Sequence, residues 1–200
     1  MEWIEQLTGC KSCIDEPEPG QWYWSASLRI GRLCFLEILG PNRKFKGLNP
    51  LKEMLRDVEK PEPIFWYVST DDFNAFKIRS EKYNAPFERI ERIKFEREGK
   101  EVDYTRGVIG PGFISQRPNV IQWQSRPKCW HAKHKNIDMQ NTCTLKALKL
   151  KSPKSKELAN LFHSLGIEME VDHGNSEVTI EIYSPKGTIF ITGKGVVRIF

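Results

Sequence analysis

Residues 142–193 have the sequence TCTLKALKLKSPKSKELANLFHSLGIEMEVDHGNSEVTIEIYSPKGTIFITG, which predicts one strand, one helix and three more strands. Residues 144–151 are rich in aliphatic side chains, as in a strand. Residues 155–165 place leucine and phenylalanine three and four positions apart, which is typical of one helix face, and Gly166 ends that helix. Residues 178–183 alternate apolar and polar side chains, and a turn at 184–187 leads into a last strand at 188–192.

The same order of elements recurs in residues 63–124. A strand at 64–69 precedes a helix that opens at Thr70-Asp71-Asp72. A hairpin (90–97 and 102–108, around Glu98-Gly99) and a strand at 119–124 follow. A recurring β-α-β-β-β unit predicts paired half-domains that bury their apolar faces together and curl around a cup.

The N-terminal residues predict an incomplete copy of this unit. A helix at 2–7 and a hairpin of strands at 22–30 and 33–39 are present, but no strand precedes the helix. Residues 49–59, which open with Asn49-Pro50, predict a connecting helix. We expect an α+β fold of curled, open-barrel mixed sheets. Its units are 1–124 (the incomplete first unit and the second unit), a linker loop at 125–141, and a third unit at 142–200.

Composition points to a globular cytoplasmic protein. Hydrophobic residues make up 39% and charged residues 28% of the 200, and no apolar run is long enough for a membrane span. The formal charge of +5 is mildly basic, but helix-turn-helix, zinc-finger and RNP-like motifs are missing, which speaks against nucleic acid as a partner. Five irregularly spaced cysteines predict reduced thiols rather than a disulfide framework.

Four segments together resemble a known family. They are LGIEMEVDHGNSEVTIEIYSPKGTIFITG, EWIEQLTG, LCFLEILGP and PNVIQWQSRP. Their apolar and turn patterns are similar to those of glyoxalase-like proteins of the vicinal oxygen chelate (glyoxalase/bleomycin resistance/dioxygenase) superfamily. The resemblance implies the curled sheets described above, and it implies little about activity because one scaffold hosts many functions.

The resemblance also implies where a divalent metal ion would sit. Members with metal chemistry hold the ion with four inward residues, mostly His and Glu. In this chain Glu37 stands at the second of those positions, the first would precede Glu2, and residues 64–66 and 121–123 supply no ligand. We therefore expect no cofactor, with a divalent metal on Glu37 as the alternative.

Glu37 itself has two interpretations. Alternation in residues 35–39 places Phe35, Glu37 and Leu39 on one strand face, and a carboxylate inside the cup needs a cation or a metal beside it. Arg29, Arg32 or Arg106 could supply the cation. Otherwise Glu37 is a structural or solvent-facing residue.

Aromatic residues outline a candidate ligand pocket. Four of the six tryptophans, Trp22, Trp24, Trp66 and Trp123, fall on or beside predicted strands, where they either wall a pocket or fill a core. Arg106 could contact an acidic ligand, or could be a surface residue beside Glu101 or Asp103.

Two clusters of metal-binding or redox residues are weaker candidates. Cys10-Lys-Ser-Cys13 is a lone CxxC motif, whereas structural zinc needs a second pair of ligands. Cys129, His131 and His134 lie close together in a basic stretch and could bind a metal or form an ordinary surface loop.

These observations leave two main hypotheses for function. The first is a metal-free binding module, or a non-catalytic member of the family, for a small, anionic metabolite. The second is a metal-dependent lyase, isomerase or dioxygenase with Glu37 as one ligand, the others coming from an upstream strand or a partner chain. A sheet edge left open by the missing strand also predicts a homodimer formed by strand pairing.

Overall fold

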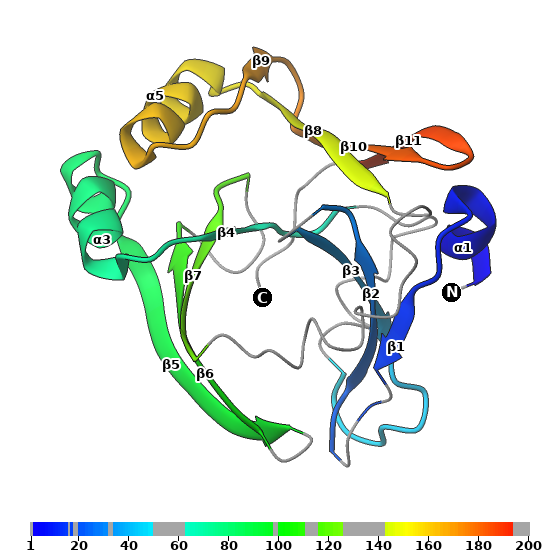
Figure 1. Cartoon of the computed structure of the whole chain (residues 1–200). Helices are drawn as coiled ribbons and strands as arrows, with labels where there is room; N and C mark the ends of the chain where they lie inside the picture. The colour runs from blue at the N-terminus through cyan, green and yellow to red at the C-terminus, as the bar shows by residue number, and fades with distance from the viewer. Residues whose placement is uncertain are drawn as a thin grey trace. The chain divides into compact units, whose positions relative to one another are not determined.

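The computed structural model describes residues 2–15, 17, 20–31, 34–49, 63–97, 100–110, 116–125 and 143–193. Residues 63–125 form one four-stranded sheet and one helix (Figure 1). The strands are β4 (Tyr67–Ser69), β5 (Phe87–Arg97), β6 (Lys100–Ile109) and β7 (Asn119–Ser125), in the order β4-β7-β6-β5. The opening strand β4 pairs in parallel with β7, so it lies at one edge of the sheet.

Helix α3 (Phe73–Lys82) begins where its sequence predicts. The side chain of Asp72 accepts a hydrogen bond from the backbone N–H of Ala75 at 2.9 Å, which satisfies one of the unpaired donors of the first turn. Phe73 and Phe76 of this helix are buried, whereas Ile78 is 66% exposed.

The C-terminal segment has the predicted order of elements along the chain, but its strands are arranged in the sheet differently from those of residues 63–125. It contains β8 (Thr144–Ser152), α5 (Ser155–Leu165), β9 (Val171–His173), β10 (Glu177–Ser184) and β11 (Gly187–Gly193). Its sheet has the order β11-β10-β8-β9, with β8 parallel to β9, so the opening strand lies inside the sheet. The two segments therefore share a sequence of elements, but the structure does not confirm a repeated unit.

The ends of α5 follow from two local features. The hydroxyl of Ser152 accepts a hydrogen bond from the backbone N–H of Lys154 at the start. At the other end Gly166 has φ of 72°, a left-handed conformation that favours glycine and ends the helix. After the helix, Ile167 N donates a hydrogen bond to Phe162 O in the turn, and the next strand begins only at Val171.

The N-terminal segment contains the predicted helix and hairpin. Helix α1 (Glu2–Thr8) precedes β1 (Cys13–Asp15), β2 (Tyr23–Arg29) and β3 (Phe35–Pro41), which form a sheet in the order β1-β2-β3. Strand β1 was not predicted, and it pairs with residues 25–27 of β2. The predicted helix at 49–59 lies outside the described residues except for Asn49, whose amide donates to the carbonyl of Trp22 at 2.6 Å.

The chain divides into two compact units. Unit 1 combines Met1–Pro61, His131–Ala147 and Ile180–Ile191, and unit 2 combines Glu62–Trp130, Leu148–Thr179 and Thr192–Phe200. Strands β8, β10 and β11 contribute residues to both units. The predicted division into continuous units, 1–124 and 142–200, was based on a repeated pattern in the sequence and stays a prediction. The predicted linker at 125–141 lies almost entirely outside the described residues.

Each unit has its own hydrophobic core. Unit 1 has one cluster, formed by Ile4, Cys10, Leu28, Ile30, Cys143, Ile182, Ile189 and Ile191. Unit 2 has a cluster between α3, α5 and the β4-β7-β6-β5 sheet, formed by Phe73, Phe76, Ala85, Ile109, Val120, Leu161 and Leu165. A second cluster of unit 2 joins α5 to its own strands through Leu150, Leu158, Phe162 and Val178. The protein is thus a mixed α+β fold with several sheets.

None of the described helices combines the length and the apolar composition that crossing a lipid bilayer requires.

Candidate functional site

One face of the β4-β7-β6-β5 sheet gathers the polar and aromatic residues of interest. In the register of the sheet, Glu91 of β5 lies opposite Arg106 of β6. Tyr104 of β6 lies opposite Trp123 of β7, one step along the same face. Tyr67 of β4 projects to this face as well, because it pairs with Asn119, which lies opposite Val108. We call Tyr67, Glu91, Tyr104, Arg106 and Trp123 the Arg106 face.

Arg106 is held in the middle of this face. Its Nη2 donates a hydrogen bond to Oε2 of Glu91 at 2.6 Å, and the two side chains are only 23% and 26% exposed. Glu91 also forms an ion pair with Arg89. The guanidinium is therefore fixed in one orientation by a charge-assisted hydrogen bond, which is stronger than a neutral one.

The charges of this cluster shift its pKa values in a consistent direction. Burial opposes the charge on Arg106, but its hydrogen bond to Glu91 and its contacts with Tyr67 outweigh that cost and raise the pKa of Arg106. The hydrogen bond from Arg106, with a further contribution from Arg89, holds the pKa of Glu91 below its ordinary value. Arg106 and Glu91 are consequently both ionised near neutral pH.

An aromatic pair adjoins the charged centre. The rings of Tyr104 and Trp123 have centroids 5.0 Å apart and planes inclined at 53°. Both side chains are half-buried. A fixed guanidinium beside aromatic surface is a common way to build a small-molecule site.

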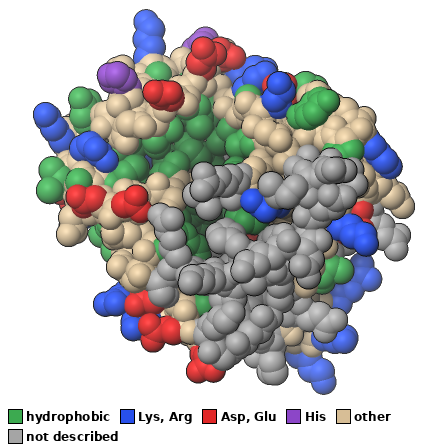
Figure 2. All heavy atoms as spheres, in the orientation of Figure 1, with side chains coloured by type: hydrophobic (Ala, Val, Ile, Leu, Met, Phe, Trp, Pro, Cys, Tyr) green, Lys and Arg blue, Asp and Glu red, His purple; other side chains and the backbone are tan. Residues whose placement is uncertain are grey.

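The opposite face of the same sheet is covered by helix. A Cβ placed on Gly107 would lie 2.6 Å from the ring of Phe73, so α3 packs directly on the backbone there. Trp66 belongs to this side, because it packs edge-on against Phe162 of α5 with ring centroids 5.8 Å apart. Its buried indole N–H has no hydrogen-bond partner among the described residues. Figure 2 shows hydrophobic side chains gathered in a hollow near α5 and β8.

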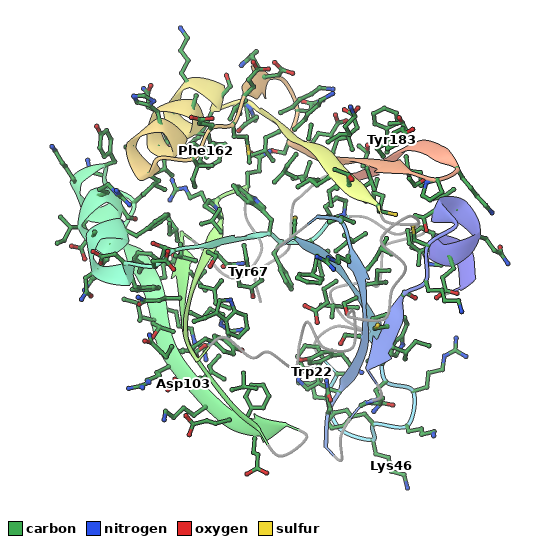
Figure 3. All side chains as sticks on the ribbon, viewed as in Figure 1. Trp22, Lys46, Tyr67, Asp103, Phe162 and Tyr183 are labelled. Carbon is green, nitrogen blue, oxygen red and sulfur yellow. The ribbon has the colours of Figure 1, made fainter. Side chains whose placement is uncertain are left out.

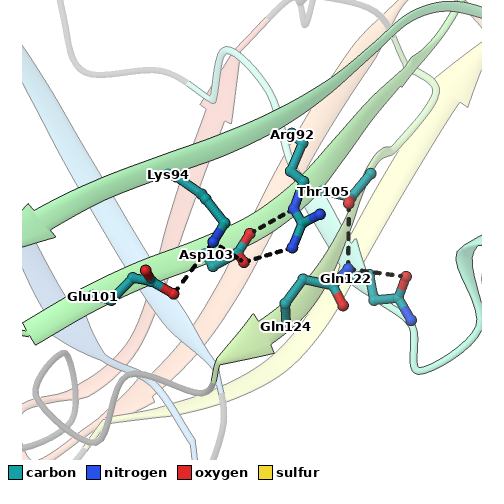
Figure 4. Close-up of polar contacts among 7 residues, drawn as sticks. All are labelled: Arg92, Lys94, Glu101, Asp103, Thr105, Gln122 and Gln124. Atoms are coloured by element: carbon teal, nitrogen blue, oxygen red, sulfur yellow. Dashed lines mark hydrogen bonds and ion pairs between the residues drawn. The ribbon is translucent and has the colours of Figure 1, made fainter.

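A second charged cluster lies on the helix-side face, beyond the part that α3 covers (Figure 4). Asp103 is 4% exposed and accepts two hydrogen bonds from Arg92, at 3.0 and 2.8 Å. Lys94 lies 3.2 Å from the same carboxylate and 3.5 Å from Glu101. Figure 3 labels Tyr67 and Asp103, which belong to the two opposite faces of this sheet. The expected alternative for Arg106, a surface residue beside Glu101 or Asp103, is not what the structure shows, because its ion pair is with Glu91.

The candidate residues of unit 1 do not share one face. Trp24 pairs with Gly40, and its ring covers that glycine on the core side of the β1-β2-β3 sheet. Glu37 pairs with Ser27 and projects to the other face, where it is exposed. One face of this sheet therefore cannot present both Trp24 and Glu37 to a ligand.

Trp22 lies just before β2. Its ring packs edge-on against Tyr23 with centroids 4.8 Å apart, and its carbonyl accepts hydrogen bonds from Asn42 and Asn49. Trp22, Trp24 and Glu37 belong to unit 1, whereas Trp66, Arg106 and Trp123 belong to unit 2. A single pocket formed by all six stays a prediction.

Metal ligands do not converge within the part of the chain that the structure describes, where no group of three His, Cys, Asp or Glu side chains could hold an ion. The residues Cys129, His131 and His134 lie outside that part. In the CxxC motif, the sulfur of Cys10 faces Cys143 at 3.0 Å.

Comparison with known proteins finds solved structures of similar fold. The chain is similar to a hypothetical protein from Staphylococcus aureus, with a TM-score of 0.54 and 14% identity over 94% of this chain and 79% of that one. The likeness extends to the fold alone. A variant of 4-hydroxymandelate synthase from Streptomyces coelicolor matches with a TM-score of 0.43 and 14% identity, over 85% of this chain and 50% of the other. No protein-family model and no curated protein matches the sequence.

Arg106 and Trp123 were predicted from the sequence as site residues, but their neighbours Tyr67, Glu91 and Tyr104 were not. A usable signal was present for two of them. The hairpin turn at residues 98–99 was predicted, and pairing residues outward from such a turn sets Glu91 against Arg106. Tyr104 follows by alternation from Arg106. Tyr67 had no such signal, since its position depends on the parallel pairing of β4 with β7.

Proposed function

We propose that the protein is a metal-free, non-catalytic module that binds a small anionic metabolite on the Arg106 face. The observation that carries the proposal is the charge of the cluster at its centre. Two guanidinium groups, those of Arg89 and Arg106, share the carboxylate of Glu91. The three side chains together have a formal charge of +1, which a carboxylate or phosphate group would neutralise.

The surroundings of this charge favour a ligand over a solvated surface pair. The Arg106 side chain is 23% exposed and its orientation is fixed by Glu91 and Tyr67, so little conformational entropy is lost when an anion binds. The adjacent Tyr104–Trp123 pair offers apolar surface to the uncharged part of the bound metabolite. A preorganised arginine beside aromatic rings suits an organic acid better than a bare inorganic ion.

The metal-dependent alternative has less support. Glu37 is the carboxylate on which it depends, and that side chain is exposed on β3, in unit 1. The homodimer formed by strand pairing stays a prediction.

Isothermal titration calorimetry with succinate, citrate and inorganic phosphate tests the proposal. We expect at least one of the three to bind the natural protein, and Arg106→Gln to weaken that binding about 10-fold or more, since hydrogen bonds to charged groups contribute about 1.5–3 kcal/mol. Arg106→Lys, which keeps the charge but loses the planar fork, should have an intermediate effect.

Arg92→Gln is the matched control, because Arg92 forms its ion pair with Asp103 on the opposite face of the same sheet. It removes the same charge and should leave affinity within about twofold. Failure of all three anions to bind at millimolar concentration contradicts the proposal. Equal weakening by Arg92→Gln and Arg106→Gln also contradicts it, because only net charge would then matter.

A further inference from the structure

Two cysteines that are far apart in the sequence meet in the core of unit 1. The Sγ atoms of Cys10 and Cys143 are 3.0 Å apart, although 133 positions separate the residues. Both residues are buried, with exposures of 3% and 1%. A disulfide bond is about 2.05 Å long, so a shift of about 1 Å would bring these sulfurs to bonding distance.

Local hydrogen bonds fix the position of Cys10. Helix α1 ends at Thr8, and Gly9 adopts φ of 73° while its N–H donates to the carbonyl of Glu5 at 2.8 Å. The hydroxyl of Thr8 donates to Ile4 O at 2.6 Å and accepts from the backbone N–H of Cys10 at 3.0 Å. The turn after α1 is thereby tied down with the Cys10 sulfur directed into the core.

Cys143 is fixed from the other side. It directly precedes β8, and the next residue but one, Leu145, donates its backbone N–H to the carbonyl of Ile30 at 2.6 Å. Apolar residues of the same cluster, among them Leu28 and Ile182, surround the pair. Burial raises the pKa of Cys143 to about 12, so this thiol is protonated and slow to react while the core is closed.

We propose that Cys10 and Cys143 form a reversible intramolecular disulfide when the protein meets hydrogen peroxide. One thiol loses its proton, and the thiolate attacks a peroxide oxygen to give a sulfenic acid and a hydroxide, which takes up the released proton to become water; the second thiol then displaces the sulfenic oxygen as another water. Overall, two thiols are oxidised by two electrons, one S–S bond forms, and peroxide is reduced to two waters. The buried setting makes the first step depend on local opening of α1.

The other cysteines fit this reaction less well. Cys13 lies three residues from Cys10 but belongs to β1, where its backbone pairs with Ser27 of β2. Cys34 packs at the margin of the same core, and burial raises the pKa of its thiol too. The 3.0 Å contact between the sulfurs of Cys10 and Cys143 therefore favours this pairing among the four cysteines that the structure describes.

The test is peroxide treatment of the natural protein followed by thiol counting in denaturant and peptide mapping without reductant. Reactive thiols should fall from five to three, because one disulfide consumes two. Mapping should join the peptides that contain Cys10 and Cys143, and dithiothreitol should restore five. The oxidised protein should unfold at a temperature higher by about 10 °C, because the cross-link closes a long loop.

Variants distinguish this pair from the other cysteines. Cys143→Ser and Cys10→Ser should each abolish the cross-link, whereas Cys13→Ser and Cys34→Ser should leave its yield unchanged. A thiol count that stays at five after hours in peroxide overturns the proposal. So does a map in which Cys10 is joined to any other cysteine, and this mapping uses the natural protein and does not depend on the folding of a variant.

Discussion

Asp103 shows how one buried carboxylate can make stability depend on pH. The hydrogen bonds from Arg92, with help from Lys94, hold the pKa of Asp103 below its ordinary value of about 3.9. A carboxyl whose pKa is lower in the folded state stabilises the fold fully above the unfolded-state pKa. That contribution is lost as the pH falls through the folded-state pKa.

Replacing Asp103 by Asn should therefore remove part of this acid sensitivity. We expect the natural protein to be more stable than Asp103→Asn at pH 7, and the difference to shrink between about pH 5 and pH 3. Urea unfolding at a series of pH values measures it. Glu101→Gln is the control, because Glu101 contacts the same Lys94 from a 65% exposed position. A stability difference that stays constant with pH would show that Asp103 acts through packing alone.

Gly107 is a residue whose lack of a side chain is required by packing. A Cβ at this position would collide with the rings of Phe73 and Phe87, which cover it from the α3 side. Gly107→Ala should destabilise the protein by about 1–3 kcal/mol through overpacking. Chemical denaturation measures the change. Gly174→Ala, where the nearest atoms belong to Lys151 at 3.6 Å, should have a much smaller effect, and equal losses would contradict the packing explanation.

The start of α3 offers a test for a single element. Asp72→Ala removes the hydrogen bond from Ala75 N and should cost about 1 kcal/mol in the free energy of unfolding. Asp71→Ala is a close control, since the Asp71 backbone carbonyl, which accepts from Gln122 Nε2 at 2.6 Å, survives the substitution. Urea denaturation of both variants makes the comparison. The capping role fails if the two substitutions destabilise equally.

Local chemistry explains which elements could be predicted. The Asp72 cap, the Gly166 stop and the alternation in 178–183 all act over a few residues, and the corresponding elements appear where expected. Strand β1 has three residues and follows from pairing with β2 alone. The position of β8 between β10 and β9 depends on contacts distant in sequence, which short-range patterns do not specify.

At the scale of the whole molecule, the two units share three strands. Because β8, β10 and β11 each contribute residues to both units, we expect the units to unfold together. Leu28→Ala in unit 1 and Phe162→Ala in unit 2 should each cost about 2–5 kcal/mol and shift a single transition. Tryptophan fluorescence and far-ultraviolet circular dichroism should give coincident curves. Separate transitions, each sensitive to one substitution, would show that the units are independent.

The candidate site was predictable to the extent that it lies on one hairpin. Arg106 and Glu91 follow from the turn at 98–99, and Trp123 joins them by antiparallel pairing. Trp24 and Glu37 were grouped from residue type, but strand alternation places them on opposite faces of their sheet. Trp66 was grouped with Arg106, although the packing of α5 holds it on the helix side.

Unit 1 is assembled from segments that are far apart in the sequence, and this has a consequence for synthesis on the ribosome. Helix α1 is synthesised long before β11, yet the ammonium of Lys186 bonds to the carbonyl of Gln6 at 2.7 Å, and residues 180–191 complete the same core. Unit 1 therefore cannot close until residues 180–191 have emerged, whereas all the strands of the β4-β7-β6-β5 sheet are available once residue 125 is out. A nascent chain stalled before residue 180 would carry an exposed, unfinished N-terminal half, which is the form that a chaperone or a protease would meet.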